Sequence, residues 1–193
     1  KSGIPKPKTY LVDTDVPNAF ATGRSPKHSA IAVTRGLTEI LDEGEVEGVL
    51  AHEMSHIKNR DTLVGTVAAT LAGALTWLAY LFYFGDERNR NALSFIFLFV
   101  LAPLAASLVR LAISRNREYL ADHTGALISN PLKLASALEK ISGSVKSKPM
   151  KGNASTAHMF IVNPFSGSSF IEMFSTHPPT EKRVAALKAM ATK

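Results

Sequence analysis

The sequence predicts an α+β protein, mainly α-helical, in which a small N-terminal β-sheet precedes an inserted two-helix transmembrane hairpin. Two long uncharged runs close together in the chain predict the hairpin. Short β-branched runs between turn residues precede them and predict the strands. Segments with helical spacing of apolar residues surround the hairpin. Because 193 residues suffice for one domain with a hydrophobic core, we expect a single domain over residues 1–193 that the hairpin interrupts.

The composition excludes several classes of protein. A content of 46% hydrophobic and 20% charged residues is too apolar for a disordered chain. The absence of cysteine excludes a disulfide scaffold, a thiolate zinc finger, an iron–sulfur site and a cysteine nucleophile. Any metal ion must therefore be held by His, Asp or Glu. Because the first residue is Lys1, we expect a fragment or a processed chain.

The N-terminal region predicts two or three strands followed by two helices. Residues 9–12 (TYLV) and 31–34 (IAVT) are β-branched runs, and the segment between them is rich in turn residues, for example at 22–26. Residues 36–41 predict a short helix. A break at 42–44 precedes a second helix, whose first turn carries acidic residues that suit the helix dipole.

The two uncharged runs cover residues 63–85 and 91–109 and predict membrane spans. A bilayer core of roughly 30 Å needs about 20 helical residues, so both runs are long enough. Gly65 and Gly73 are expected to let the two helices approach closely. The alternative is a pair of buried helices in a soluble core. After the hairpin, we expect helices over 111–128, 131–141 and 180–190, with a mobile loop over 142–157.

The basic residues near the span ends predict the orientation in the membrane. Five of them flank the open end of the hairpin, against two in its loop, Arg88 and Arg90. The positive-inside rule therefore places both polar flanks in the cytoplasm. The net charge of +6 is explained by contact with anionic lipid, and no nucleic-acid-binding motif is found.

Residues 52–56 read His-Glu-Met-Ser-His, the H-E-x-x-H pattern. Two imidazoles four residues apart on a helix face one metal ion, and the Glu beside the first can reach a water on that metal. Zinc is the ion that two His and a carboxylate prefer. The sequence therefore predicts His52 and His56 as ligands and Glu53 as general base, the alternative being a helix surface that carries two His by chance.

A catalytic zinc needs a third protein ligand, and Glu118 is the candidate. Asp122 lies one turn later on the same helix face and is expected to accept a hydrogen bond from a ligand His. His56 lies seven residues before the first span and Glu118 nine after the second, so both lie about 10 to 14 Å outside the bilayer, on the same side. The alternative is that Glu118 pairs with Arg115 or Arg117 on a solvated face.

The remaining histidines carry weaker signals. His28 and His158 lie in loop-like segments and are expected to be exposed, and His123 points away from Asp122. His177, followed by Pro-Pro and six residues before Arg183, could join it in donating to an oxyanion or to substrate carbonyls. Spacing alone favours a capped helix start for this segment.

Four ordered blocks carry a family resemblance: residues 18–23 (NAFATG), the 52–56 motif, 114–122 (SRNREYLAD) and 176–183 (THPPTEKR). The chain resembles the HtpX group of membrane-bound zinc metalloproteases, which are related to the CAAX prenyl endopeptidases. The resemblance covers nearly the whole chain. It implies a minimal gluzincin (zincin-like) fold with one zinc on His52, His56 and Glu118, and it favours a substrate role for His177 and Arg183.

The resemblance also implies a biological role. We expect cleavage of misfolded or unfolded membrane proteins at the cytoplasmic face of a prokaryotic membrane, alongside other quality-control proteases. Family members carry a further apolar segment ahead of the strands, and this chain begins after it. An extended substrate is expected to pair with a sheet edge near Asn18, Ala19, Phe20 and Ala21, because backbone pairing selects unfolded chains.

Two other functions are weighed against peptide-bond hydrolysis outside the bilayer. Cleavage inside the membrane is disfavoured because Glu45, Glu47, Lys58 and Arg60 surround the motif. A non-catalytic membrane scaffold or adaptor with a structural metal site is the second alternative. Structural zinc sites are usually closed by four protein ligands, whereas this sequence offers three and an acid placed for catalysis.

Overall fold

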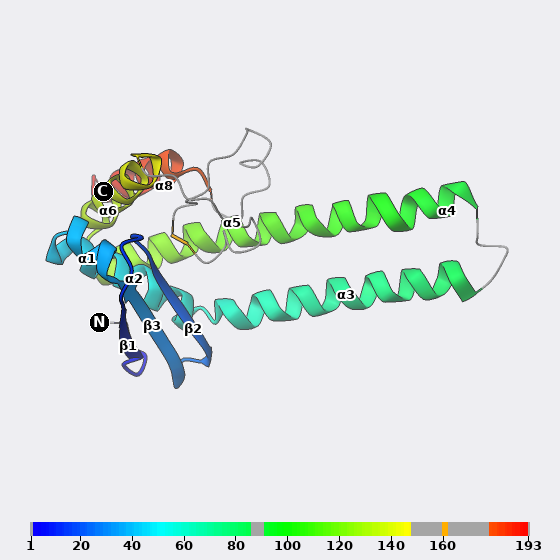
Figure 1. Ribbon diagram of the computed structural model, residues 1–193, viewed down its shortest axis with the longest axis horizontal. Coiled ribbons are helices and arrows are strands. Elements are labelled where there is room, and N and C mark those ends of the chain that lie inside the picture. Colours follow the sequence, from blue (N-terminus) through cyan, green and yellow to red (C-terminus); the bar gives the residue numbers. More distant parts are fainter. Residues whose placement is uncertain (1, 86–90, 148–159, 162–177, 193) are drawn as a thin grey trace.

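The computed structural model describes residues 2–85, 91–147, 160–161 and 178–192. A compact head holds the sheet and several helices, and two long helices project from it side by side (Figure 1). Both termini of the chain lie in the head (Figure 1). The structure is therefore mainly helical with one small sheet, as the sequence predicts.

The sheet contains β1 (Lys8–Val12), β2 (Ala19–Ser25) and β3 (His28–Thr34) in the order β1-β3-β2. The central strand β3 pairs parallel with β1 and antiparallel with β2. The turn predicted over 22–26 is wrong for residues 22–25, because β2 continues to Ser25, and the turn begins at Pro26. Gly23, with φ 140°, lies at an irregularity of the ladder, a conformation that glycine tolerates in a strand.

Two capped helices follow the sheet. Thr34 caps α1 (Arg35–Ile40) by accepting a hydrogen bond from the backbone of Leu37. Helix α2 (Glu43–Lys58) begins at Glu43, within the predicted break, because Asp42 and Glu45 exchange side-chain to backbone hydrogen bonds across its first turn. The H-E-x-x-H pattern therefore lies on the last turns of a helix with a capped N-terminus.

The projecting hairpin is formed by α3 (Asp61–Gly85) and by a second helical arm. This arm contains α4 (Ala92–Ile96), a π-helical turn η2 (Phe97–Leu101) and α5 (Ala102–Ile128). Both arms are long and apolar enough to cross a membrane, and their most apolar windows have no buried residue. The alternative of two buried core helices is therefore wrong, and the exposed apolar surface indicates membrane association.

Two features of the hairpin differ from simple expectation. The π-helical turn ends two residues before Pro103, whose missing N–H disturbs the regular hydrogen-bond ladder. Gly65 and Gly73 face open space, with no heavy atom within 4 Å of an added Cβ, so the predicted close packing at these glycines is wrong.

Helices α6 (Pro131–Ser147) and α8 (Thr180–Ala191) complete the head. The core lies between these helices, α2 and the inner face of β3, and includes Ile31, Leu138 and Leu187. The predicted loop over 142–157 is wrong for residues 142–147, which extend α6, because Ile141 and Ser142 are buried and prolong its packed face. Residues 148–157 of that prediction lie outside the described part of the chain.

Candidate metal centre

The site forms where α5 crosses α2 at a glycine. A Cβ atom on Gly125 would lie 2.9 Å from the backbone nitrogen of His52 and 3.0 Å from its Cα, so only glycine allows this approach. Glu118 and Asp122 lie seven and three residues before Gly125, on the same face of α5. The crossing therefore places both carboxylates over the motif of α2.

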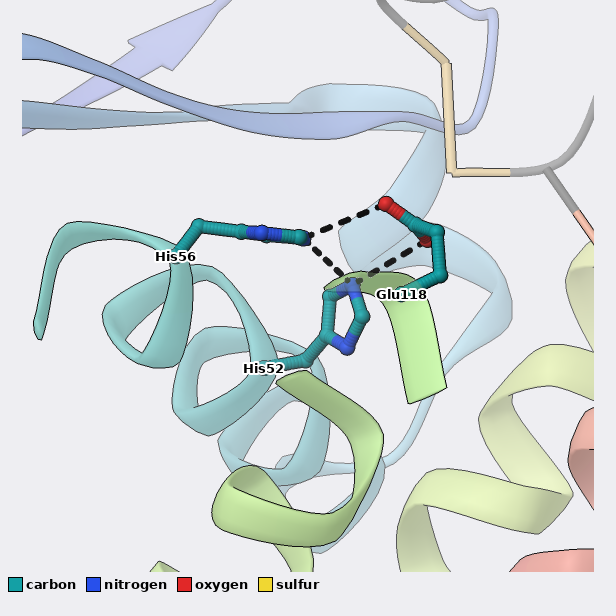
Figure 2. A group of neighbouring side chains, drawn as sticks. All are labelled: His52, His56 and Glu118. Atoms are coloured by element: carbon teal, nitrogen blue, oxygen red, sulfur yellow. Dashed lines mark hydrogen bonds and ion pairs between the residues drawn. The ribbon is translucent and has the colours of Figure 1, made fainter. Parts of the chain in front are cut away.

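Three side chains converge there (Figure 2). The Nε2 atoms of His52 and His56 lie 3.0 Å apart. Glu118 places Oε2 at 3.8 Å from Nε2 of His52 and Oε1 at 3.5 Å from Nε2 of His56. His52 and Glu118 are buried, and His56 is partly buried. The structure thus brings together the three residues that the sequence predicts as ligands.

The donor set fits a metal ion. One ligand atom from each of His52, His56 and Glu118 lies within 4.8 Å of the other two. A tetrahedral ion with bonds of about 2.1 Å separates its ligand atoms by about 3.4 Å, close to the distances observed here. Two imidazoles and a carboxylate in a buried place are also the donors that a transition metal prefers.

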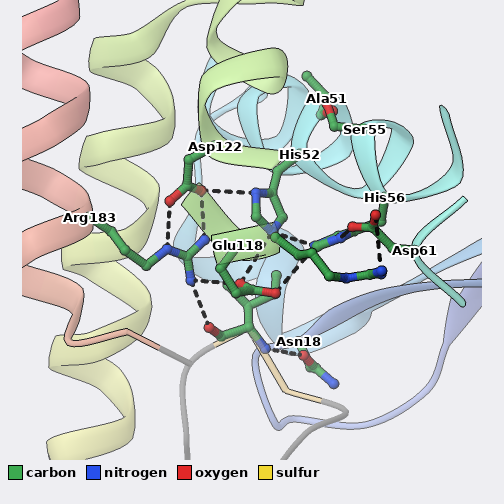
Figure 3. Close-up of polar contacts among 11 residues, drawn as sticks. Asn18, Ala51, His52, Ser55, His56, Asp61, Glu118, Asp122 and Arg183 are labelled. Carbon is green, nitrogen blue, oxygen red and sulfur yellow. Dashed lines mark hydrogen bonds and ion pairs between the residues drawn. The ribbon is translucent and has the colours of Figure 1, made fainter. Parts of the chain in front are cut away.

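On the side of His52 opposite Nε2, Asp122 contacts the ring and Arg183 contacts Asp122 (Figure 3). Nδ1 of His52 lies 2.9 Å from Oδ1 of Asp122. Nε and Nη2 of Arg183 donate to the two carboxylate oxygens of Asp122, both at 2.7 Å. Asp122 therefore lies against the ring of His52, and Arg183 orients Asp122.

His56 has a similar support that the sequence analysis missed. Its Nδ1 lies 2.5 Å from Oδ2 of Asp61, and Oδ1 of Asp61 lies 3.1 Å from Nη2 of Arg117. The signal was present in the sequence: an acidic residue five positions after the second His, at the start of an uncharged run. Glu118 is buried beside the two His and not on a solvated face, and Arg117 pairs with Asp61.

Glu53 lies next to the three side chains and is 4% exposed. Burial raises the pKa of its carboxyl group above the ordinary value, against the opposing effect of His52 and His56. The backbone of Ala21 on β2 lies near the carboxyl group and opposes this rise in pKa slightly. A buried carboxyl group with a raised pKa, beside an edge strand, is suited to exchange protons with a bound peptide.

The pKa of His56 reflects two opposing causes. Burial lowers it, but the hydrogen bond to Asp61 and the charges of Glu118 and Glu53 raise it more, to about 9. Without a metal ion, His56 is therefore protonated at neutral pH. A metal ion that binds here must displace this proton.

The predicted substrate segment is only partly accessible. Asn18 and Ala19 are buried, and Oδ1 of Asn18 accepts a hydrogen bond from the backbone of Ile161. Phe20 and Ala21 are partly exposed on β2, which is an edge of the sheet. Of the four residues, these two remain open to a peptide.

Arg183, which the family resemblance assigns to the substrate, is buried beside the ligand candidates. It is 1% exposed, and besides Asp122 it contacts the carbonyl of Ile161 at 3.3 Å and Oε2 of Glu118 at 3.4 Å. This buried position favours a role in positioning the ligand candidates over direct contact with substrate. His177 and His158 lie outside the described residues. His28 is exposed, as predicted, but it is the first residue of β3 and does not lie in a loop. His123 is also exposed.

Comparison with known proteins identifies the family. The model of peptidase family M48 matches residues 1–191. A protein named Protease HtpX homolog from Pyrococcus furiosus is 57% identical over 201 residues, covering 99% of this chain and 70% of the relative. Another of the same name from Aquifex aeolicus is 50% identical over 207 residues, covering 100% of this chain and 68% of the relative.

A solved structure shares the fold. The crystal structure of S. mikatae Ste24p matches 95% of this chain and 45% of its own length, with a TM-score of 0.65 and 21% sequence identity. The family match over almost the entire chain and the close relatives agree with the resemblance seen in the four sequence blocks. The chain belongs to peptidase family M48 and is a metallopeptidase of the HtpX type.

Proposed function

We propose that this chain is a zinc-dependent endopeptidase of the membrane that hydrolyses peptide bonds of unfolded or misfolded membrane proteins on the cytoplasmic side. The observation that carries the proposal is the convergence of His52, His56 and Glu118 within 4.8 Å, with the buried Glu53 beside them. Three protein ligands leave a fourth position for water or substrate, which distinguishes a catalytic from a structural zinc site.

His52, His56 and Glu118 would hold the zinc, one ion per chain. Zinc bound there would polarise the scissile carbonyl and lower the pKa of the attacking water. Asp122 fixes the ring of His52 and keeps its Nε2 available as a ligand. Arg183 keeps Asp122 charged and in place, so we assign it a positioning role behind the ligands.

Glu53 is the proton carrier. Its carboxylate takes a proton from the attacking water and passes it to the nitrogen of the leaving amine. Burial raises the pKa of this carboxyl group above its ordinary value, so the protonated form that must donate to the leaving amine is easier to reach. The backbone of Ala21 on β2 lies near the carboxyl group, at the sheet edge where the peptide would lie.

The substrate would bind as an added strand along the free edge of β2. Phe20 and Ala21 are the partly exposed residues there, whereas Asn18 and Ala19 support the strand from within. Backbone pairing recognises an extended chain with little regard to side chains. This preference suits unfolded proteins in quality control. His177 remains a candidate donor to the substrate carbonyl.

The domain, a minimal gluzincin over residues 1–193, would stand at the cytoplasmic face with residues 63–85 and 91–109 in the bilayer. Exposed apolar side chains along both arms support two spans, among them Leu71 at 61% and Leu108 at 53% exposure. A two-span hairpin returns the chain to the side it left. Glu118 therefore meets His52 and His56 outside the bilayer.

The ligand assignment is tested by zinc stoichiometry of detergent-purified variants. His52→Ala, His56→Ala and Glu118→Ala should each lose the one zinc per chain that the parent binds. His123→Ala, an exposed histidine on the same helix as Glu118, is the matched control and should keep it. Full zinc content in any of the three ligand variants would contradict the assignment.

A further inference from the structure

Each imidazole of the site is backed by a carboxylate and an arginine, but the two chains of contacts differ in origin. Asp122 and Arg183 support His52 from α5 and α8. Asp61 and Arg117 support His56 from α3 and α5. The side chains of Asp61 and Arg117 are 8% and 17% exposed, so the second pair is also largely shielded from water.

The second pair lies at the base of the membrane hairpin. Asp61 is the first residue of α3, and Arg117 directly precedes Glu118 on α5. Their ion pair therefore joins the first residue of α3 to the middle of α5, next to Glu118. Asp122, in contrast, lies on the same helix as Glu118 and is insensitive to the spacing of the arms.

The two oxygens of Asp61 have separate partners. Oδ2 meets Nδ1 of His56, and Oδ1 meets Nη2 of Arg117. A carboxylate that accepts from Nδ1 directs the lone pair of Nε2 towards the metal position. With Arg117 on the other oxygen, the carboxylate cannot rotate freely, so the ring of His56 is fixed through both helices.

We propose that Asp61, held by Arg117, is the positioning residue for His56 and makes the affinity of the site for metal depend on how α3 and α5 meet at the base of the hairpin. This inference rests on the proposed function, since it concerns the same metal ligands. By thermodynamic linkage, a bound metal ion must in turn hold the two arms together more firmly. A change in the membrane that spreads the arms would then weaken the metal site.

The first test measures the zinc affinity of the full chain by chelator competition. Asp61→Ala should weaken binding about 10- to 100-fold, the range seen when a group behind a ligand is lost. Asp61→Asn, which keeps an oxygen for Nδ1 but loses the ion pair, should weaken it less. Asp13→Ala, at an 88% exposed aspartate, is the matched control and should bind as the parent does.

Arg117 is tested in a double-mutant cycle. If Arg117 acts through Asp61, Arg117→Ala should weaken zinc binding in the parent and have no further effect in the Asp61→Ala background. Additive effects would overturn the shared role. A zinc affinity of Asp61→Ala equal to that of the parent would overturn the proposal. If Asp61→Ala does not fold, the other two variants decide. Zinc affinities of Asp61→Asn and Arg117→Ala that both equal the parent's would then overturn the proposal.

The second test measures the arms directly. The chain has no cysteine, so Leu71→Cys and Leu108→Cys in one chain give two spin labels, one on each exposed arm. Adding zinc should narrow the distribution of label distances in the parent and leave it broad in the Asp61→Ala background. An unchanged distribution in a zinc-loaded parent would overturn the coupling, whereas a parent that binds no zinc would refute the proposed function instead.

Discussion

Arg183 and Asp122 form a buried two-pronged ion pair, with both hydrogen bonds at 2.7 Å and side chains 1% and 5% exposed. They come from α8 and α5, 61 residues apart in the sequence. The pair thus fastens the C-terminal helix to the helix that carries Glu118. Since Asp122 also lies 2.9 Å from Nδ1 of His52, the same contact determines the position of a candidate ligand.

Replacement of Arg183 should be strongly destabilising. Arg183→Ala leaves Asp122 buried without its cation, which typically costs about 3 to 5 kcal/mol. Lys188→Ala, on the same helix, removes a pair with Glu139 whose side chains are 55% and 51% exposed. This control should lose about 1 kcal/mol or less. Thermal unfolding in detergent compares the two, and equal midpoints would contradict the structural role of Arg183.

Gly125 should not tolerate a side chain. Gly125→Ala pushes α5 away from the backbone of His52, so we expect a loss of about 1 to 3 kcal/mol and weaker zinc binding. Gly143→Ala on α6, where nothing lies within 4 Å of an added Cβ, is the control and should be neutral or stabilising. Unfolding curves and zinc titrations report both effects; a parent-like Gly125→Ala would mean that the helices do not approach this closely.

Zinc affinity should rise with pH. Burial lowers the pKa of His56, but Asp61 and Glu118 raise it to about 9 in the metal-free protein. Zinc must displace this proton, so affinity should increase by up to about tenfold per pH unit from neutral pH to about 9 and then level off. Chelator competition across this range, with calorimetry in two buffers to detect proton release, provides the check. A flat profile would show that His56 carries no proton in the metal-free state.

Replacement of Arg60 by glycine should stabilise the protein. It is an exposed residue with φ 53° at the turn between α2 and α3, a conformation that costs a side chain about 1 kcal/mol. Arg60→Gly should therefore raise stability by about 0.5 to 1 kcal/mol. Lys58→Gly, two residues earlier and helical, should lower it by a similar amount. The two variants should shift the unfolding midpoint in opposite directions. Shifts of the same sign would show that the backbone of Arg60 is not strained.

Several features of the site could be predicted because they depend on local patterns. The four-residue spacing of His52 and His56 on a helix is visible in the sequence, and the two-span hairpin explains how Glu118 returns to them. The partner of His52 could also be predicted, since Asp122 lies one turn from Glu118. These inferences need only helical periodicity and the geometry of a bilayer.

Other features depend on tertiary contacts that no local pattern reveals. Arg183 could not be placed behind Asp122 from spacing, because the contact depends on how α8 packs against α5. The pairing of Asp61 with Arg117 could not be predicted, because Arg117 lies 56 residues later, beyond both arms of the hairpin. Residues 22–25 of β2 were expected in a turn, but pairing with β3 overrides the turn preference around Gly23.

The most direct test of the central claim is proteolysis of unfolded casein by the zinc-loaded parent and by Glu53→Gln. Glutamine has nearly the same shape but cannot take a proton, and Glu53 is not among the ligand candidates. We predict equal zinc content and a fall in cleavage rate of at least about 100-fold, as expected for loss of a general base. Cleavage by zinc-loaded Glu53→Gln at the parent rate would contradict the account.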